Sequence, residues 1–395
     1  MDYEFTEKQK RLRRAIEQFS DSEIASKASI LDQYEKGTVG ELMKERFIKL
    51  AQAGYLSIGH DISYGGTDLD LVSQCIVYEA IAKACASTAL SVFASVGLVG
   101  SSLKLFGTDV QKEQFLPGLL NGSLIGCFGY SENDAGSDIL NIGTTARKVR
   151  DKWVINGIKD LVTNAPIADL FIVLSLNGKG SGPGEETKAM TFFILPKGTD
   201  GLRVEDSIDT LGFRGSPLGK VHLENCEVEE SFILGKGEER GLDQVTRILD
   251  FAMIMMSSLC VGISMGCLEE AVIRAKTRKA FGNTIGSYQE VGFKLADMFT
   301  YSDLGRLLTQ RAAVAMESNE KEARMLASCA KVFTSEGATK IASWALQIFG
   351  GHGYIKGESV ERFYRDAKLG EIAFGTPEVL RTSIIAKDIL DRFSN

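Results

Sequence analysis

The sequence predicts an α+β protein in three successive regions, with a helical domain at residues 1–122, a β domain at 123–238 and a second helical domain at 239–395. In the first and last regions apolar residues recur at three- and four-residue spacing, which is the period of an amphipathic helix. In the middle region they alternate with polar residues, which is the period of a strand. Helices and strands do not alternate along the chain, so a parallel sheet of the Rossmann type is not expected.

The first region contains two strong helix starts. Thr6-x-x-Gln9 and Thr108-x-x-Gln111 are capping boxes, in which each side chain can satisfy the free backbone N–H of the other residue. Between them the stretch "LVSQCIVYEAIAKACASTALSVFASVGLVGSSLKLF" is apolar on nearly every face, with small residues interleaved. Such a helix is buried on all sides and closely packed.

The middle region has the features of a small sheet. The string "TTARKVRDKWVINGIKD" predicts a hairpin that turns at Arg150-Asp151-Lys152, with Trp153 and Ile155 on one face. Further strands are expected at "DLFIVLSL", "MTFFILP" and "GKVHLENCEVEE". The Gly/Ser-rich segment "NGKGSGPGEE" predicts a surface loop between two of them.

The last region returns to helices, at "EEAVIRAKTRKAF", "FKLADMFTYSDLGRLLTQRAAVAM" and "ARMLASCAKVFTSEGATKIASWALQIF". A final helix is expected to begin at Thr376, with Thr376 as N-cap, Pro377 as the first helical residue and Glu378 in the first turn. The turn before it carries a large apolar residue, Phe374.

Composition excludes several classes of protein. The net charge of −7 argues against nucleic acid as a partner, because a phosphate backbone needs a basic surface. No cysteine or histidine spacing typical of a metal site occurs, and no uninterrupted apolar stretch of about 18 residues predicts a membrane span. The N-terminal stretch lacks an apolar targeting segment, and the seven cysteines are scattered and odd in number. Reduced thiols in the cytoplasm are therefore expected.

Three motifs point to ligand binding, although each also has a plain structural interpretation. In "GYSENDAGSD", Gly136 and Ser137 could bring backbone N–H groups to a ligand, or the segment could be a solvated loop. In "TRKAFGNTIGSYQ", Arg278 could bind a phosphate or only complement a helix C-terminus. In "QIFGGHGYI", one glycine would end a helix, whereas three in four residues indicate that another group approaches the backbone closely.

Taken together, the motifs resemble one family over almost the whole chain. The strings "YSENDAGSD", "WVINGIKDLVTNAPIADLFIV", "LGFRGS", "RKAFG", "LQIFGGHGY" and "YRDAKLGEIAFGT" resemble the acyl-CoA dehydrogenase family. The string "VTNAPIADLFIV" is also similar to members that oxidise acyl groups on carrier proteins. The resemblance implies an N-terminal helical domain, a middle β domain and a C-terminal four-helix domain. It also implies FAD as cofactor, a homotetramer in which a neighbouring subunit completes the flavin site, and an electron-transferring flavoprotein as electron acceptor.

The resemblance assigns binding roles to individual residues. The residues expected along the flavin ring are Phe128, Tyr130, Ser131, Gly136, Ser137, Leu161 and Thr163. Those expected to reach the pyrophosphate and adenine across a subunit contact are Arg278, Phe281, Gln289, Gln347, Gly350 and Gly351, with Thr376 and Glu378 touching the cofactor from the last helix. Leu161 stands where many members have a tryptophan, which leaves one face of the ring more open. The residues expected to contact the acyl thioester are Ser91, Ser137, Asp250, Met253 and Phe374.

The resemblance also exposes a departure at the catalytic base. The family reaction removes a proton from the carbon beside a thioester, which requires a proton acceptor within hydrogen-bond reach. Most members place a glutamate where this chain has Phe374, and others place one where it has Ala252, followed by Met253 in place of an arginine. Neither a phenyl ring nor a methyl group can accept a proton, so the catalytic residue is unknown.

The leading hypothesis is an FAD-dependent oxidation of an acyl thioester, either acyl-CoA or acyl-carrier protein. Its acyl group would be unusual, cyclic or bulky, and a base at a non-standard position would take the proton. One alternative is flavin chemistry that needs no such base, such as elimination or hydroxylation. Another is a non-catalytic protein that binds acyl thioesters.

Overall fold

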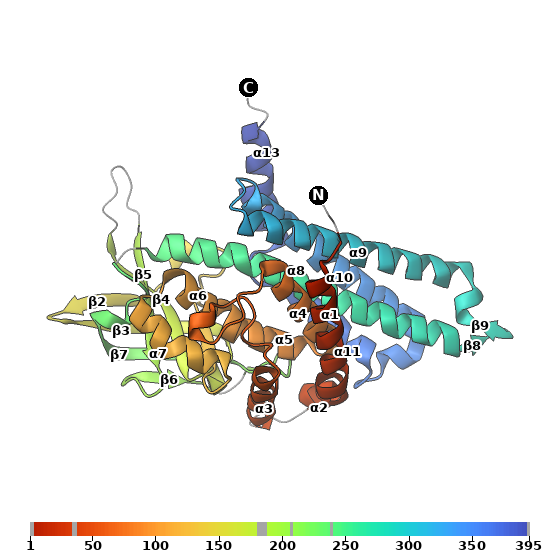
Figure 1. Cartoon of the computed structure of the whole chain (residues 1–395), viewed down its shortest axis with the longest axis horizontal. Helices are drawn as coiled ribbons and strands as arrows, with labels where there is room; N and C mark the ends of the chain where they lie inside the picture. The colour runs from red at the N-terminus through yellow and green to blue at the C-terminus, as the bar shows by residue number, and fades with distance from the viewer. Residues whose placement is uncertain (1–3, 34–37, 180–187, 206–207, 238–239, 393–395) are drawn as a thin grey trace.

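The computed structural model describes residues 4–33, 38–179, 188–205, 208–237 and 240–392. Figure 1 shows the sheet at one end of the long axis, the N-terminal helices beside it and the long C-terminal helices extending to the other end. The predicted boundary at residues 238 and 239 lies outside the described residues, as does most of the "NGKGSGPGEE" segment. The order helical, β, helical is as predicted, and the residue boundaries of the domains stay a prediction.

Helices make up the N-terminal domain, and both predicted capping boxes, at Thr6 and Thr108, are present. Its α-helices among the described residues are α1 (Glu7–Phe19), α2 (Ala28–Gln33), α3 (Thr38–Gln52), α4 (Leu71–Ala84), α5 (Ala86–Val92), α6 (Ser101–Phe106) and α7 (Asp109–Leu120). The apolar stretch between α4 and α6 is buried, as predicted, but it is not one helix. It breaks at Cys85, whose backbone is extended at φ −159° and ψ 103°, and it continues through the π-helical turn η4 (Phe93–Gly100).

The middle domain is one curled sheet with a predominantly antiparallel pairing. Its strands are β1 (Gly126–Gly129), β2 (Thr145–Val149), β3 (Lys152–Thr163), β4 (Leu170–Lys179), β5 (Lys188–Pro196), β6 (Leu202–Val204) and β7 (Leu218–Glu229). They are ordered β1-β4-β2-β3-β7-β6, with β5 paired to β4. The predicted hairpin is present as β2 and β3, and Trp153 and Ile155 are both buried in a core cluster of the sheet.

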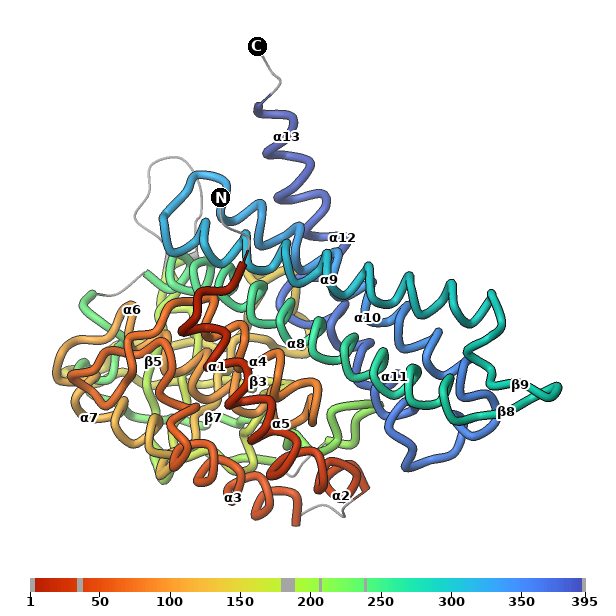
Figure 2. Tube along the Cα trace, turned by 45° about the vertical axis from the view of Figure 1, so that its right-hand side comes forward, coloured from red at the N-terminus to blue at the C-terminus, as the bar shows by residue number. Residues whose placement is uncertain are grey.

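Long helices form the C-terminal domain. They are α8 (Gly241–Thr277), α9 (Gln289–Glu317), α10 (Ala323–Phe349) and α11 (Ser359–Ile372), followed by the short α12 (Pro377–Leu380) and α13 (Lys387–Arg392). A small hairpin of β8 (Lys279–Ala280) and β9 (Asn283–Thr284) joins α8 to α9. In Figures 1 and 2 the α8–α11 bundle extends away from the sheet, and α13 projects from it. Thr376 caps α12 through the N–H of Val379, as predicted.

Two helical stretches, Ala86–Phe106 and Gly241–Thr277, have the length and composition of membrane spans. However, the most apolar window of the first is 83% buried inside the protein and that of the second is 94% buried, as in core helices. The seven cysteines are free, and all but Cys329 are buried. Within the described ranges, no cluster of three or more His, Cys, Asp or Glu side chains could hold a metal ion.

Helix α11 ties the three domains together through two adjacent residues. Arg365 forms a two-pronged ion pair with Asp32 of α2, at 3.0 Å from Nη1 and 2.6 Å from Nη2, and it also donates to the Leu211 carbonyl at 3.1 Å. The next residue, Asp366, accepts the backbone N–H of Phe213 at 2.6 Å. Loop 211–213 belongs to the middle region, so one turn of α11 is bonded to both other domains.

The two carboxylates of this junction differ in their partners. Asp32 pairs directly with the Arg365 guanidinium. Burial raises the pKa of Asp366 from 3.8 to about 7, with the nearby Asp32 charge adding to the increase, while the Phe213 N–H, Arg362 and Arg365 oppose it. The junction therefore contains an ion pair and, beside it, a carboxyl that titrates near neutrality.

The buried ion pair predicts a large loss of stability on substitution. Replacing Arg365 by Met leaves Asp32 buried without its cation, so the free energy of unfolding should fall by about 3–5 kcal/mol. Arg381→Met is the matched control, because its pair with Glu336 is half-exposed and should contribute only about 0–1 kcal/mol. Urea denaturation followed by circular dichroism measures both. Equal losses in the two variants would contradict the assignment of Arg365 as the junction of the domains.

The raised pKa of Asp366 predicts a pH-dependent effect. Its folded-state pKa lies above the unfolded value, so the folded protein binds the extra proton between pH 3.8 and about 7, and this contribution to stability is lost as pH rises through that window. Asp366→Asn keeps the oxygen that accepts from Phe213 but does not titrate. Its stability relative to the wild type should therefore increase from pH 4 to pH 7, as measured by thermal unfolding across that range. A difference that is flat with pH would show that Asp366 is ionised throughout.

Candidate functional site

The turn between α11 and α12 has an uncommon backbone conformation. Phe374 has φ 56° and Gly375 has φ 98°, so two successive residues lie in the left-handed region. Glycine enters this region freely, but a large aromatic side chain does so only when its surroundings hold it there. Thr376 then starts α12 directly, with Pro377 as its first residue. The turn thereby directs the side chain of Phe374 back toward the N-terminal helices.

Phe374 joins a group of rings that we call the aromatic cluster, formed by Tyr78, Phe93, Phe251 and Phe374. Phe93 is at its centre, with its ring centroid 5.3 Å from that of Phe374 at an interplanar angle of 77° and 5.9 Å from that of Tyr78 at 83°. Phe251 of α8 lies 6.3 Å from Phe93. Edge-to-face contacts of this kind are favourable and leave little room for a charged group without a partner.

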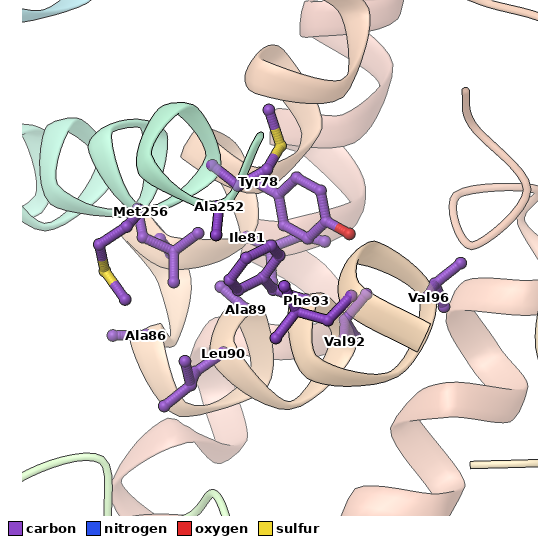
Figure 3. Close-up of a cluster of buried hydrophobic side chains, with 14 of the residues drawn as sticks. Tyr78, Ile81, Ala86, Ala89, Leu90, Val92, Phe93, Val96, Ala252 and Met256 are labelled. Carbon is purple, nitrogen blue, oxygen red and sulfur yellow. The ribbon is translucent and has the colours of Figure 1, made fainter. Parts of the chain in front are cut away.

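Ala252 faces the same apolar region. Its side chain is fully buried, and Figure 3 shows it beside Tyr78 and Ile81 of α4 and close to Phe93. The two positions at which the resemblance leads one to expect a glutamate therefore belong to the same hydrophobic core cluster or pack against it. Both are occupied by apolar side chains, and neither can exchange a proton.

Ser91, a predicted substrate contact, is engaged inside the protein. It is fully buried, and its hydroxyl donates to Asn164 Oδ1 at 2.5 Å. Asn164 Nδ2 donates in return to the Ser91 carbonyl at 2.8 Å, and the Ser216 hydroxyl lies 3.3 Å from that of Ser91. These bonds fasten α5 to the middle domain. A contact between Ser91 and substrate stays a prediction.

The predicted substrate residues Asp250 and Met253 lie on α8 on either side of Ala252. Burial raises the pKa of Asp250 to about 6, and Arg324 of α10, whose Nε lies 3.1 Å from Oδ1, opposes that increase. On a helix, a separation of two residues turns the Asp250 side chain about 200° away from that of Ala252. Met253 is buried, and its sulfur lies 3.6 Å from the Ser328 hydroxyl. The roles of both in binding substrate stay predictions.

One group of predicted cofactor residues lies on the middle domain, where β1 and β3 end. The Phe128 and Tyr130 rings are 6.0 Å apart, and the Ser131 hydroxyl donates to the Asp160 carbonyl at 3.1 Å. Leu161 has φ 55° and is 60% exposed, so its side chain stands away from the sheet, and Thr163 is half-buried two residues later.

A buried ion pair that the sequence analysis missed supports the loop carrying Gly136 and Ser137. Lys159 of β3 is fully buried and donates to Glu132 Oε1 at 2.6 Å. Glu132 also accepts the backbone N–H groups of Gly143 at 2.6 Å and Thr144 at 3.0 Å. Burial lowers the pKa of Lys159 to about 8, and Glu132 opposes that decrease. The available signal was alternation along the strand, which puts Lys159 on the same face as Trp153 and Ile155.

The glycines of the ligand motifs separate into two kinds. A Cβ on Gly353 would lie 2.7 Å from that of Phe349, so internal packing explains this glycine, and Gly350 has φ 61° after the end of α10. A Cβ added to Gly136 or to Gly351 would have no protein atom within 4 Å, and both residues are exposed. Their surroundings leave space for a second molecule, which fits the approach of a cofactor to the backbone.

The second group of predicted cofactor residues lies at the far end of the chain. Arg278 directly precedes β8, and Phe281 lies between β8 and β9 and is 94% exposed. Gln347, Gly350 and Gly351 are exposed and lie at the end of α10. This end of α10 contacts the end of α8, because the Arg274 guanidinium carbon lies 5.4 Å from the centroid of the Phe349 ring.

Gln289 begins α9 next to the same hairpin. In Figure 1 this end of the molecule is opposite the sheet, so a single chain does not bring the two groups together.

The remaining predicted cofactor residues, Thr376 and Glu378, lie at the start of α12. Thr376 is half-buried and its hydroxyl serves as N-cap, whereas Glu378 is exposed. The backbone N–H of Glu378 and the Thr376 hydroxyl lower the pKa of Glu378, so this helix start carries a negative charge. Contact with a cofactor at these residues stays a prediction.

Comparison with known sequences places all three regions in one family. The N-terminal domain of acyl-CoA dehydrogenase matches residues 6–123, the middle domain matches 127–226 and the C-terminal domain matches 239–390. The probable acyl-CoA dehydrogenase YngJ of Bacillus subtilis is 38% identical over 99% of this chain and 100% of its own. The 3-(aryl)acrylate reductase of Clostridium sporogenes is 35% identical over 98% of this chain and 99% of its own. The cyclohex-1-ene-1-carbonyl-CoA dehydrogenase of Syntrophus aciditrophicus is 34% identical over 96% of this chain and 90% of its own.

Solved structures agree with these matches. Butyryl-CoA dehydrogenase from Megasphaera elsdenii superposes with a TM-score of 0.89 at 30% identity, covering 99% of this chain and 100% of the other. The prolyl acyl carrier protein oxidase AnaB superposes with a TM-score of 0.87 at 28% identity, covering 98% of this chain and 100% of the other. Domain order, sheet, helical bundle and sequence identity along nearly the full length lead to one conclusion: the chain belongs to the acyl-CoA dehydrogenase family.

Proposed function

We propose that this chain uses FAD to oxidise an acyl thioester whose acyl group is cyclic or bulky. As a member of the acyl-CoA dehydrogenase family the protein is an oxidoreductase that acts on CH–CH groups. The aromatic cluster carries the proposal about the acyl group. Phe374 places an aromatic ring against Phe93 at a position where the resemblance leads one to expect an acid, and an aromatic lining of this kind favours a flat or bulky apolar partner.

Two relatives support an acyl group of this kind. One is named for aryl acrylates and another for a cyclohexene carbonyl thioester, and each aligns with nearly the whole chain. A conjugated or ring-bearing acyl group also changes the proton chemistry, because unsaturation can move the acidic C–H away from the carbon next to the thioester. A base at a non-standard position would then be required, in keeping with the apolar side chains of Phe374 and Ala252.

The cofactor proposal rests on the two groups of predicted residues. FAD would supply a hydride acceptor. The exposed backbone at Gly136 and Ser137 would contact the flavin end, with Lys159 and Glu132 keeping that loop in place. The residues at the far end, such as Arg278 and Gln347, would bind the phosphate and adenine end of a cofactor held by a second copy. The proposed assembly is therefore a homo-oligomer, and we expect a tetramer.

The remaining proposals concern partners. The superposition with AnaB, which is named as an acyl carrier protein oxidase, supports acyl-carrier protein as an alternative to acyl-CoA. An electron-transferring flavoprotein would reoxidise the flavin, and the enzyme would work in the cytoplasm. The alternative function is elimination or hydroxylation with the same flavin, and a further one is thioester binding without turnover. Because Phe374 and Ala252 cannot act as a base, both alternatives are compared with the dehydrogenase function in the experiments below.

A substrate screen separates these functions. The purified protein should be yellow, and under anaerobic conditions a cyclic or aryl-bearing acyl thioester should bleach the flavin absorbance by hydride transfer. The screen covers linear, branched, cyclic and carrier-bound thioesters, with the free acids as controls. Binding of a thioester without bleaching by any of them would rule out the dehydrogenase function and leave the two alternatives, flavin chemistry without substrate oxidation and thioester binding without turnover.

Restoring the missing acid tests the position of residue 374. Phe374→Glu places a proton acceptor beside Phe93, and it should raise the oxidation of saturated linear acyl-CoA by about 10²–10⁴-fold over the wild type. Apolar surroundings raise the pKa of such a carboxyl, so the new activity should increase with pH. Phe374→Gln is the matched control, since it has similar size and polarity but cannot take a proton. Equal activity of the two variants would show that residue 374 does not face the reacting carbon.

A further inference from the structure

We propose that Lys331 is a positioning residue, whose buried ammonium holds the turn 373–376 in its left-handed conformation and so places residue 374 and the start of α12. The proposal rests on the proposed function only in so far as residue 374 faces the acyl group. The effect of Lys331 on the turn itself is independent of any activity.

The contacts of Lys331 all lead to the turn and the helix before it. Lys331 lies in the middle of α10 and is fully buried. Its Nζ donates to the backbone carbonyl of Gly375 and to that of Glu371, at 3.4 Å from the latter. Carbonyls at the end of a helix lack partners within the helix, and a cation there is favourable. One ammonium therefore bonds both the last turn of α11 and the residue that follows Phe374.

The last helical turn of α11 is also fixed by other contacts, in which residues 373–376 take no part. Glu371 accepts from the Thr339 hydroxyl of α10 at 2.5 Å and from Lys368 at 2.7 Å. A Cβ on Gly370 would lie 2.6 Å from the sulfur of Cys260, so α11 lies directly against α8 at this point. Helix α11 would therefore stay in place without Lys331, whereas the turn would lose the bond at Gly375.

The conformation of the turn explains why it needs such support. Phe374 with φ 56° is costly for an aromatic residue, and in an unrestrained chain it would return to a negative φ. That rotation would move the carbonyl of Gly375 and carry the Phe374 ring away from Phe93. A charge-assisted hydrogen bond to Gly375 opposes this movement, and it is stronger than a neutral one.

The titratable groups that act on Lys331 come from four helices. They are Cys260 of α8, Glu336 of α10, Glu371 of α11 and Glu378 of α12. Burial lowers the pKa of Lys331 to about 8, and these groups oppose that decrease. The ammonium is therefore present at pH 7 and is lost as pH rises through about 8, which leaves a neutral amine as a weaker donor.

Amide hydrogen exchange measures the turn directly, without substrate or turnover. In the purified protein Lys331→Met, an uncharged side chain of similar length, should speed exchange of the 373–380 amides by at least about tenfold, because a hydrogen bond from a charged group is lost. Lys331→Arg keeps the charge and should recover part of the protection. Lys340→Met replaces an exposed lysine of the same helix and should leave the segment unchanged.

A second pair of measurements keeps the proposal testable if Lys331→Met does not fold. In the wild type, exchange of the 373–380 amides, corrected for its intrinsic pH dependence, should increase between pH 7 and 9 with a midpoint near 8. In Phe374→Gly, where a positive φ has no steric cost, this pH-dependent increase in exchange should be less than half as large as in the wild type.

The outcomes of these experiments are distinct. Wild-type protection of the turn in Lys331→Met, or no pH-dependent change in the wild type, would overturn the proposal. Protection lost equally throughout the C-terminal domain would also overturn it, because it would assign Lys331 to general packing. Failure of the flavin to bleach in the substrate screen would refute the proposed function, but it would leave the effect of Lys331 on the turn intact.

Discussion

The structure depends on the way α11 is held against both other domains. Arg365 is bonded to α2 through Asp32, and Asp366 is bonded to the middle domain through the N–H of Phe213. These two bonds fix α11, and the segment that follows α11 is positioned by that helix. The turn at Phe374 lies two helical turns further on, so its distance from Phe93 depends on two polar contacts that do not belong to the site.

Much of this arrangement could be predicted from sequence, because it rests on local signals. The order of the domains, the capping boxes, the hairpin at Arg150 and the start of α12 at Thr376 follow from periodicity and from residues a few positions apart. The break at Cys85 could not be predicted, because the apolar pattern continues across it. Contacts such as Lys331 with Gly375 join segments distant along the chain, and periodicity carries no information about them.

The chemistry of the site is an apolar surface held by polar groups outside it. The side chains of Phe374 and Ala252 cannot accept a proton, while the hydrogen bonds of Ser91 with Asn164 fasten α5 to the sheet. Sequence reasoning assigned Ser91 to the substrate because of its helix, but helical phase alone does not tell whether a hydroxyl faces a ligand or another domain. Lys159 was overlooked for a different reason: alternation along the strand puts it on the buried face, but a lysine is rarely fully buried.

Two lysines buried in different domains each support one of the segments expected to face the ligand, Lys159 the loop with Gly136 and Lys331 the turn with Phe374. Hydration of a charged group becomes less favourable as temperature rises, so the free-energy cost of burying each ammonium falls on warming. Hydrophobic contacts weaken on cooling, in the same direction. Both segments should therefore be held least firmly in the cold, and a protein of this design should lose the order of its binding surface at low temperature before it loses its fold.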